Sequence, residues 1–474
     1  MRAGPGRRCG SSAAGVRFGE IRPALGLRFA LWILAGALGT GATAAADRTR
    51  LPRFPNILLI TVDTLRADHL SGYGYERPTS PNIDRLMNGG VRFNQARTVV
   101  PLTCPALSSM FTAVYPHVHG STRNGIPIRA GMSSFPKFLA HNGYATAAFV
   151  SNWALQDRLC GLAEHFEQWE EVLVRRQWVF SKREADAGDV TSEAVAWLER
   201  YVNEPGAGPF LLWVHYMDPH SPYVLKREFL EQLGIGDTKG FFSLHNRYDT
   251  EIAYVDQNIG RLLERAGELL DLRNTLILFT SDHGESLGDH GYWGHGKHVY
   301  ENGLQIPLSI TWQGRIEPGQ IDAPALITDV ASTLLALAGF PIPERFEGLD
   351  WTAVFRRDAA EPLDRVTYHQ AHRGTVQPTE DPTDLRRKGL LEVGRIEENR
   401  KEVLVVRKDR RRVFDLVEDR AERNNLAPTD SSPTPELATW LEEVRSWLSR
   451  SDELPPPGLE EEDVERLRSL GYVD

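Results

Sequence analysis

The chain has few cysteines, no apolar run of membrane-spanning length after its N-terminal segment, and no excess of basic residues, and each shortage excludes a class of protein. Only three of the 474 residues are Cys, and Cys9 lies in an N-terminal segment that resembles an export signal. The remaining two, Cys104 and Cys160, are too few for the disulfide framework of a cysteine-rich secreted domain. Because no later run is long and apolar enough to cross a bilayer, we predict no stable membrane span after signal removal.

The N-terminal segment has the pattern of a signal peptide. Several arginines precede or enter the apolar stretch from Phe29 to Leu38, and a run of small residues ends at Ala46. We therefore predict a signal in residues 1–46 and export to the periplasm or the extracellular space. An uncleaved membrane anchor is the alternative, although the stretch is short for a span. Residues 1–46 carry six Arg and one Glu, so their removal changes the net charge from −10 to −15 and makes a nucleic-acid partner unsuitable.

Apolar runs alternate with amphipathic segments over most of the chain. The runs predicted as strands are Ala145–Val150, Phe210–His215, Thr275–Thr280 and Leu308–Thr311. The helical stretches between them include Val190–Val202, Ile252–Leu269 and Asp329–Ala338. Strands that alternate with helices predict an α/β fold, here a three-layer α/β/α sandwich with a mostly parallel central sheet.

The pattern changes at about residue 358. Short, highly charged, alternating strands are predicted over Arg365–His372 and Leu390–Val406, and the apolar residues from Leu437 to Leu448 follow helical spacing. We predict a catalytic α/β domain in residues 47–357, a smaller C-terminal antiparallel α+β subdomain in residues 358–450, and an acidic tail in residues 451–474. Residues 218–245 carry few strong signals and are predicted to form a loop over the site.

Two of the buried strand patterns end in residues that suit a metal ion. The run Asn56–Val62 is followed by Asp63, and the run beginning at Thr275 ends before Asp282-His283-Gly284. In a parallel sheet, ligands bind outside the carboxyl ends of the strands, so these side chains are expected at one edge. Strand-end turns with a capping Asp are the ordinary alternative for either motif alone. Carboxylates and an imidazole from two strands instead favour a divalent-cation site.

The segment from Pro101 to Phe111 has the pattern of a turn that leads into a helix. Thr103 and Cys104 lie at its start, where the positive potential of a helix N-terminus favours an ionised oxygen or sulfur. A simple N-cap role for Thr103 before Pro105 is the structural alternative. Cys104 is more often a small buried apolar residue than a nucleophile.

Several of these motifs, in this order, resemble the sulfatase family of the alkaline phosphatase superfamily. The likeness runs from about residue 54 to 426 and rests on Asp63, Thr103–Pro116, Asp218–Tyr223, Asp249–Asp256, Asp282–Glu285, Phe414–Leu416 and Glu422–Leu426. The resemblance implies an α/β/α sandwich with a smaller C-terminal sheet. It also implies a metal-bound nucleophile that attacks a sulfate or phosphate ester.

The chain departs from the usual sulfatase pattern around the nucleophile. Sulfatases carry Cys or Ser, any residue, Pro, any residue and Arg, and the first residue becomes formylglycine. Aligned on Pro105, the nucleophile position falls on Thr103 and the Arg position on Leu107. Relatives with a plain Thr nucleophile act on phosphorus esters, so sulfate and phosphate esters remain rival substrates. Phosphonate monoester hydrolases similarly pair a single first Asp with Asp-His, as Asp63 and Asp282-His283 do here.

The resemblance assigns the metal and nucleophile roles residue by residue. Thr103 would bind the cation and attack in line, while Asp63, Asp282 and His283 complete the site. The metal would be Ca, Zn or Mn. A second cation, held by His295 with Asp218, remains an alternative, as in two-zinc relatives.

The remaining roles concern the substrate. Asn124 resembles the family's contact to a non-bridging oxygen, although an Asn before Gly is also an ordinary turn residue. His220 resembles its leaving-group histidine, and His295 or Lys297 would take the place of a lysine that contacts the ester. The substrate would be a small-molecule, glycan or lipid ester. A phosphoethanolamine-type transferase and a non-catalytic binding protein of the same fold are the alternatives. The sequence leaves the oligomeric state open.

Overall fold

The computed structural model describes residues 54–178, 181–236, 243–376, 380, 389–428 and 432–450. The predicted signal in residues 1–46 and the predicted acidic tail in residues 451–474 lie outside the described residues. Among the described helices, none combines the length and the apolar character needed to cross a membrane.

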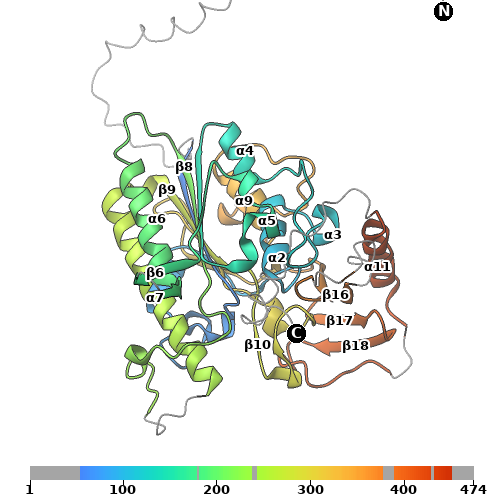
Figure 1. Cartoon of the computed structure of the whole chain (residues 1–474). Helices are drawn as coiled ribbons and strands as arrows, with labels where there is room; N and C mark the ends of the chain where they lie inside the picture. The colour runs from blue at the N-terminus through green and yellow to red at the C-terminus, as the bar shows by residue number, and fades with distance from the viewer. Residues whose placement is uncertain are drawn as a thin grey trace, which may run out of the picture. The chain divides into compact units, whose positions relative to one another are not determined.

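A central eight-stranded sheet forms the middle layer of the α/β domain (Figure 1). Its strands, in spatial order, are β13 (Gly319–Ile321), β2 (Val91–Phe93), β12 (Leu308–Thr311), β9 (Thr275–Ser281), β1 (Asn56–Val62), β8 (Phe210–Tyr216), β4 (Ala145–Val150) and β5 (Gln168–Glu171). β12 runs antiparallel to both β9 and β2, and every other pair is parallel. The sheet is mostly parallel, as predicted, and β1, β8 and β9 are almost entirely buried because helices cover both faces.

The alternation of side chains along β1 divides the core into two layers. Leu58 and Ile60 pack with helices α1 (Pro81–Asn88), α6 (Ala187–Tyr201) and α7 (Leu244–Leu269). Ile57 and Leu59 point to the opposite face, toward α2 (Thr103–Thr112), α4 (Phe135–His141) and α9 (Asp329–Leu337). Figure 1 shows these two helical layers on either side of the sheet. The predicted three-layer α/β/α sandwich is confirmed.

Two predicted helices begin earlier than their apolar periodicity indicates, because polar caps extend them. α6 begins at Ala187 after Asp186, which forms a capping box with Asp189. α7 begins at Leu244, since the Ser243 side chain accepts a hydrogen bond from the Asn246 amide. The short elements that complete this part are β3 (Ala96–Arg97), α3 (Pro116–His119), α5 (Asp157–Cys160), β6 (Val174–Trp178), β7 (Ser181–Glu184), β10 (Ser286–Leu287), β11 (Trp293–Gly294), α8 (Glu301–Leu304), β14 (Ala325–Leu326) and α10 (Thr352–Phe355).

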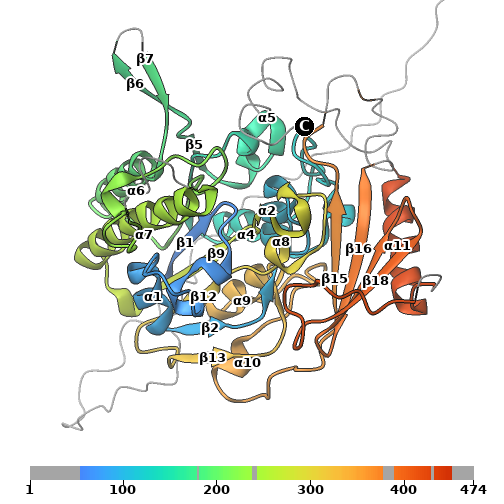
Figure 2. The same cartoon turned by 90° about the horizontal axis from the view of Figure 1, so that it is seen from below.

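A separate antiparallel sheet and one helix form the C-terminal part (Figure 2). The sheet has the order β15 (Thr367–His372), β16 (Leu390–Glu397), β17 (Arg400–Val405) and β18 (Arg410–Asp415), and α11 (Pro435–Leu448) packs on it. The stretch Leu390–Val406, predicted as short alternating strand, divides into β16 and β17. Glu398 and Asn399 have φ of 46° and 64°, the left-handed pair that suits a two-residue hairpin turn.

Candidate active site

The carboxyl ends of β1 and β9 bring the predicted metal ligands together. The two strands pair in parallel up to Val62 and Ser281, so Asp63 and Asp282 follow at the same level. Ligand atoms of Asp63, Asp282 and His283 all lie within 4.8 Å of one another, and the three side chains are fully buried. The strand-end rule therefore identified this cluster correctly as a geometric group.

The backbone fixes the orientation of the His283 ring. Its Nδ1 lies 2.8 Å from the Gly284 carbonyl, which can only accept, so Nδ1 carries the proton and the neutral ring presents a bare Nε2. That Nε2 lies 3.4 Å from Asp282 Oδ2 and 3.8 Å from Asp63 Oδ1. Burial, followed by the nearby His295, lowers the pKa of His283, and burial raises the pKa of Asp282. Three buried electron-pair donors that converge in this way suit a cation.

Asp282 supplies the observation that tests this fit. Its Oδ1 accepts hydrogen bonds from the backbone amides of Thr64 at 3.1 Å and His283 at 2.8 Å. Its Oδ2 is buried and accepts no hydrogen bond from any described residue. A buried carboxylate oxygen without a donor is costly unless a cation or proton compensates it. The donor set of two carboxylates and one imidazole fits a divalent ion such as Ca²⁺, Mn²⁺ or Zn²⁺.

Gly284 is required by close packing rather than by a sharp turn. The backbone of Gly284 has no positive φ. A Cβ at this position would lie 2.1 Å from the Asn302 carbonyl oxygen. The Gly284 amide also donates to the Gly303 carbonyl at 2.9 Å, so the segment after the metal cluster is held against α8.

Thr103 begins α2 and faces the cluster. Its Oγ1 lies 3.4 Å from His283 Nε2, and the side chain is fully buried. The Asn124 Oδ1 accepts from the Cys104 amide at 3.1 Å and so caps the helix, while the buried Asn124 Nδ2 has no partner among the described residues. A hydroxyl and an amide donor thus lie at one edge of the cluster, on a helix N-terminus that favours negative charge.

A cavity of about 670 Å³ opens next to the cluster on the side of the two predicted histidines. His220 and His295 both line it, and their ring centroids are 5.2 Å apart. The His220 Nδ1 donates to the Ser221 carbonyl at 2.6 Å, and burial, with His295 next, lowers its pKa well below the usual value. The His295 ring centroid lies 4.5 Å from that of His283. His295 therefore connects the cavity to the metal cluster.

The comparisons with known proteins identify the family. Residues 55–340 match the family described as Sulfatase, and residues 288–445 match the family described as N-sulphoglucosamine sulphohydrolase, C-terminal. The chain belongs to the sulfatase family. It is thus a sulfatase-like ester hydrolase, as the sequence motifs predicted.

Individual relatives of this sulfatase are distant. The Escherichia coli K12 protein named uncharacterized sulfatase YidJ is 27% identical over 359 residues, which cover 63% of this chain and 71% of the relative. An N-acetylglucosamine-6-O-sulfatase of Bacteroides thetaiotaomicron is 24% identical and is covered to 75% of its length, against 68% of this chain.

Solved structures share the fold of this sulfatase. A structure in complex with its substrate D-glucosamine-2-N,6-O-disulfate has a TM-score of 0.65 at 21% identity, covering 86% of this chain and 100% of that chain. The phosphonate monoester hydrolase of Agrobacterium radiobacter has a TM-score of 0.64 at 19% identity, covering 84% and 96%. At these identities the likeness concerns the fold alone.

The contacts that Lys297 and Asp218 make lie outside the cluster of Asp63, Asp282 and His283. Lys297 lies over the Tyr292 ring, 5.9 Å from its centroid, and is not among the residues that line the cavity next to the cluster. The Asp218 Oδ2 accepts from the Ala187 amide at 2.9 Å, and its Oδ1 is 3.6 Å from Lys226 Nζ. Of the two candidates for the ester contact, the fold places His295 in the cavity.

Sequence reasoning missed two polar residues that surround Asp63. The Asn152 amide group donates to Asp63 Oδ2, and His215 Nε2 lies 4.0 Å from the same oxygen. His215 lies inside an apolar strand pattern, where burial lowers its pKa to about 3. Asn152 follows strand β4 after one residue, so the strand-end rule that found Asp63 could have found it as well.

A disulfide next to the nucleophile position was also missed. Cys104 and Cys160 form it, although they are 56 residues apart in the sequence. The prediction that two cysteines form no disulfide framework holds only in the sense that one bridge is not a framework. Cys104 is buried as expected, but it is covalently bonded and links the first turn of α2 to the end of α5.

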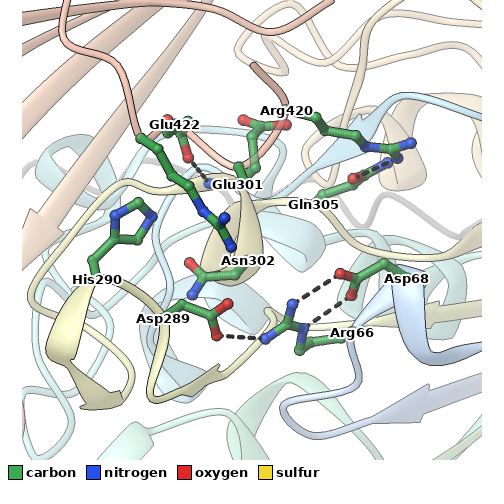
Figure 3. A pocket seen from close by; sticks show the side chains of 11 residues that line it. Arg66, Asp68, Asp289, His290, Glu301, Asn302, Gln305, Arg420 and Glu422 are labelled. Atoms are coloured by element: carbon green, nitrogen blue, oxygen red, sulfur yellow. Dashed lines mark hydrogen bonds and ion pairs between the residues drawn. The ribbon is translucent and has the colours of Figure 1, made fainter. Parts of the chain in front are cut away.

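A second cavity, of about 510 Å³, is lined by residues from the catalytic and C-terminal parts (Figure 3). Arg66 lies in it between two carboxylates, 2.8 Å from Asp68 Oδ2 and 2.8 Å from Asp289 Oδ2. The Glu301 amide donates to Glu422 Oε2 at 2.6 Å, which joins α8 to the segment after β18. These acidic and basic groups satisfy one another, so the second cavity marks a charged boundary between the two parts of the chain.

Proposed function

We propose that this protein is a metal-dependent hydrolase of sulfuric or phosphoric esters that uses Thr103 as its nucleophile. The observation that carries the proposal is the 3.4 Å separation between Thr103 Oγ1 and His283 Nε2, within a buried cluster that suits a divalent cation. Membership of the sulfatase family supports ester hydrolysis. Thr103 would supply an oxygen nucleophile in the place of the usual formylglycine.

The chain's own groups divide the work in this mechanism. A bound cation would neutralise charge on the ester and favour ionisation of the attacking oxygen. Thr103 Oγ1 forms a bond to sulfur or phosphorus while the bond to the alcohol oxygen breaks, and the departing alcohol takes up a proton. Asn124 Nδ2 is oriented to donate to a non-bridging oxygen. His220 and His295, on the cavity side, bind the leaving alcohol, and water then hydrolyses the threonine ester.

Replacing Thr103 tests this proposal. Thr103→Val keeps the shape but removes the hydroxyl, and Thr103→Ser is the matched control that keeps it. We expect the Val variant to lose at least about 10³-fold in kcat with unchanged folding, and the Ser variant to retain measurable activity. Aryl sulfate, phosphate monoester, phosphodiester and phosphonate substrates should be compared on one preparation. Undiminished hydrolysis by the Val variant would remove Thr103 from the mechanism.

A preference for phosphoric or phosphonic esters is the second candidate. It is supported by Thr103 in place of a formylglycine-forming residue and by Leu107, a fully buried apolar residue where sulfatases carry Arg. Less positive charge near the nucleophile changes how the transition state is stabilised. The ratio of kcat/KM for phosphonate and phosphate esters to that for the aryl sulfate distinguishes the two preferences. A transferase would instead pass the group to an added alcohol, and a binding protein would bind the ester without turnover.

We also propose that the protein is exported after cleavage at about residue 46. The Cys104–Cys160 disulfide supports an oxidising compartment, where such bonds persist. Mass spectrometry of the mature protein tests this, since an intact N-terminus in the cytoplasm would contradict it. Within the mature chain, residues 47–357 and 358–450 are proposed as the catalytic domain and the C-terminal subdomain.

A further inference from the structure

A chain of buried hydrogen bonds links the core of the sheet to the outer side of the metal cluster. Thr61 and His215 lie opposite each other on the paired strands β1 and β8. The Thr61 Oγ1 lies 2.8 Å from Trp213 Nε1 and 2.8 Å from His215 Nδ1, and all three side chains are fully buried. The other ring nitrogen, His215 Nε2, lies 4.0 Å from Asp63 Oδ2. One imidazole ring therefore connects this chain to a predicted metal ligand.

The donors in this chain fix the tautomer of His215. An indole nitrogen can only donate, so the Trp213 N–H occupies a lone pair of the Thr61 hydroxyl. The hydroxyl proton then needs an acceptor, and among the described residues the remaining partner of Thr61 Oγ1 is His215 Nδ1. An imidazole that accepts at Nδ1 is neutral and carries its proton on Nε2. His215 therefore places an N–H beside Asp63, whereas His283 presents a bare nitrogen to the cluster.

The N–H of His215 compensates charge on one side of the Asp63 carboxylate. No described residue forms a hydrogen bond with His215 Nε2, so the interaction of this buried dipole with the carboxylate is electrostatic, and it is strong where the dielectric constant is low. The same oxygen, Asp63 Oδ2, accepts from the Asn152 amide group. The other oxygen, Oδ1, lies 3.8 Å from His283 Nε2. Two N–H groups therefore lie on the outer oxygen, and the inner oxygen is turned toward the cluster.

We propose that His215 is a positioning residue for the metal ion, and that the chain from Trp213 through Thr61 to His215 orients Asp63 so that Oδ1 is its ligand atom. His215 acts only through Asp63, without contact to the cation or the ester. Donors behind a ligating carboxylate fix its orientation, and their loss typically lowers metal affinity about 10- to 100-fold. This inference rests on the metal dependence in the proposed function, but its test measures metal binding and so does not depend on hydrolysis.

Calorimetric titration of the EDTA-treated, full-length protein with Ca²⁺, Mn²⁺ and Zn²⁺ tests this inference. Thr61→Val keeps the side-chain shape but removes the hydroxyl, and we expect the dissociation constant of the tightest-bound ion to rise about tenfold. Thr61→Ser keeps the hydroxyl and should bind the ion as wild type does. Thr191→Val is the matched control, because Thr191 is also buried and loses a 2.9 Å hydrogen bond with the Tyr216 hydroxyl on the other face of β8. The control should leave the dissociation constant unchanged.

A double-mutant cycle separates action through His215 from a general effect on the core. His215→Leu should itself weaken metal binding about 10- to 100-fold, and adding Thr61→Val to it should cause no further loss. Unchanged affinity in the Thr61→Val protein would overturn the inference, and so would additive losses in the double variant. A wild-type protein that binds none of the three ions would overturn it as well. A protein that binds the ion but hydrolyses no ester would refute the proposed function, while the same titrations still decide the role of His215.

The tautomer gives a second readout that needs no metal. Nitrogen NMR of the metal-free, ¹⁵N-histidine-labelled protein distinguishes a proton on Nε2 from one on Nδ1, and the signals of His215 are those that disappear in His215→Leu. We expect the proton on Nε2 in wild type and in Thr61→Ser, because the hydroxyl donates to Nδ1 in both. A wild-type ring with its proton on Nδ1 would refute the proposed chain.

Discussion

Lys401 is the residue whose removal should destabilise this protein most clearly without touching the active site. Its fully buried ammonium lies 3.1 Å from Glu301 Oε1 and 2.8 Å from Glu422 Oε1. Arg97 Nε lies 2.9 Å from the other oxygen of Glu301. Two positive and two negative charges therefore balance at the contact between α8 and the C-terminal sheet.

Lys401→Met keeps most of the apolar stem and removes one of these charges. Breaking a buried pair from one side typically costs about 3–5 kcal/mol. The lost hydrogen bond to Glu301 and the lost ion pair with Glu422 give a similar figure, at about 1.5–3 kcal/mol each. For the 428 residues that follow the proposed signal (474 − 46), the unfolding entropy is roughly 0.9 kcal/mol/K, so a loss of about 4 kcal/mol corresponds to a Tm lower by about 4 °C.

Chemical denaturation and thermal melts of wild type and variant at pH 7.5 measure this effect. Arg400→Met, on the exposed side of the same strand, is the control and should stay within about 0.5 kcal/mol of wild type. Adding Glu422→Gln to Lys401→Met should recover part of the loss, because charge balance returns. A free energy of unfolding within about 1 kcal/mol of wild type for Lys401→Met would refute the reasoning.

The pKa of Glu301 determines how the stability difference between wild type and Lys401→Met changes with pH. Burial alone would raise that pKa, but Arg97 and then Lys401 outweigh burial and lower it. A lowered folded-state pKa gives stability that is present above the unfolded-state value of about 4.3 and is lost as the pH falls further. Without the Lys401 ammonium, the pKa of its carboxylate partners in the folded protein is higher, so one of them is protonated at a higher pH. Protonation removes the unbalanced negative charge in the variant. The difference in the free energy of unfolding between wild type and Lys401→Met should therefore shrink from pH 7.5 to pH 5.

The remaining predictions concern the metal cluster and the disulfide. Dialysis against EDTA should abolish ester hydrolysis, and about one equivalent of Ca²⁺, Mn²⁺ or Zn²⁺ per chain should restore it. Two firmly bound ions per chain would contradict the single cluster that the described residues form. Asp282→Asn should lower metal affinity at least about tenfold by metal analysis, whereas Asp271→Asn, at an exposed position before β9, should not. Cys160→Ser should lower the free energy of unfolding by up to about 4 kcal/mol, the chain-entropy value for a 56-residue separation. Dithiothreitol should leave the Tm of this variant unchanged, because it has no bridge to reduce. If the variant has the same Tm as wild type, the bridge does not constrain the unfolded chain.

Much of the sheet could be predicted from the sequence because its strands are apolar on both faces. The runs that became β1, β4, β8, β9 and β12 needed no knowledge of their partners, since burial alone determines their composition. The start of α7 was harder to predict, because Ser243 caps a first turn that carries little apolar periodicity. Local polar caps, unlike apolar periodicity, are short signals with many alternatives.

The residues of the candidate site likewise differ in how clearly the sequence indicates them. Asp63, Asp282 and His283 lie at strand ends and could be predicted from that position, and the resemblance supplied Thr103 and Asn124. His215 could not be found in this way, because within an apolar run it has the pattern of core.

The Cys104–Cys160 bridge bears on how this sulfatase becomes active after synthesis. With Cys104 oxidised to a disulfide, no thiol remains beside the proposed nucleophile for conversion to formylglycine. A threonine hydroxyl is chemically complete when it leaves the ribosome, so maturation would require disulfide formation and metal loading but no modifying enzyme. Heterologous production should therefore depend on the redox conditions of the host compartment, and not on whether the host can generate formylglycine.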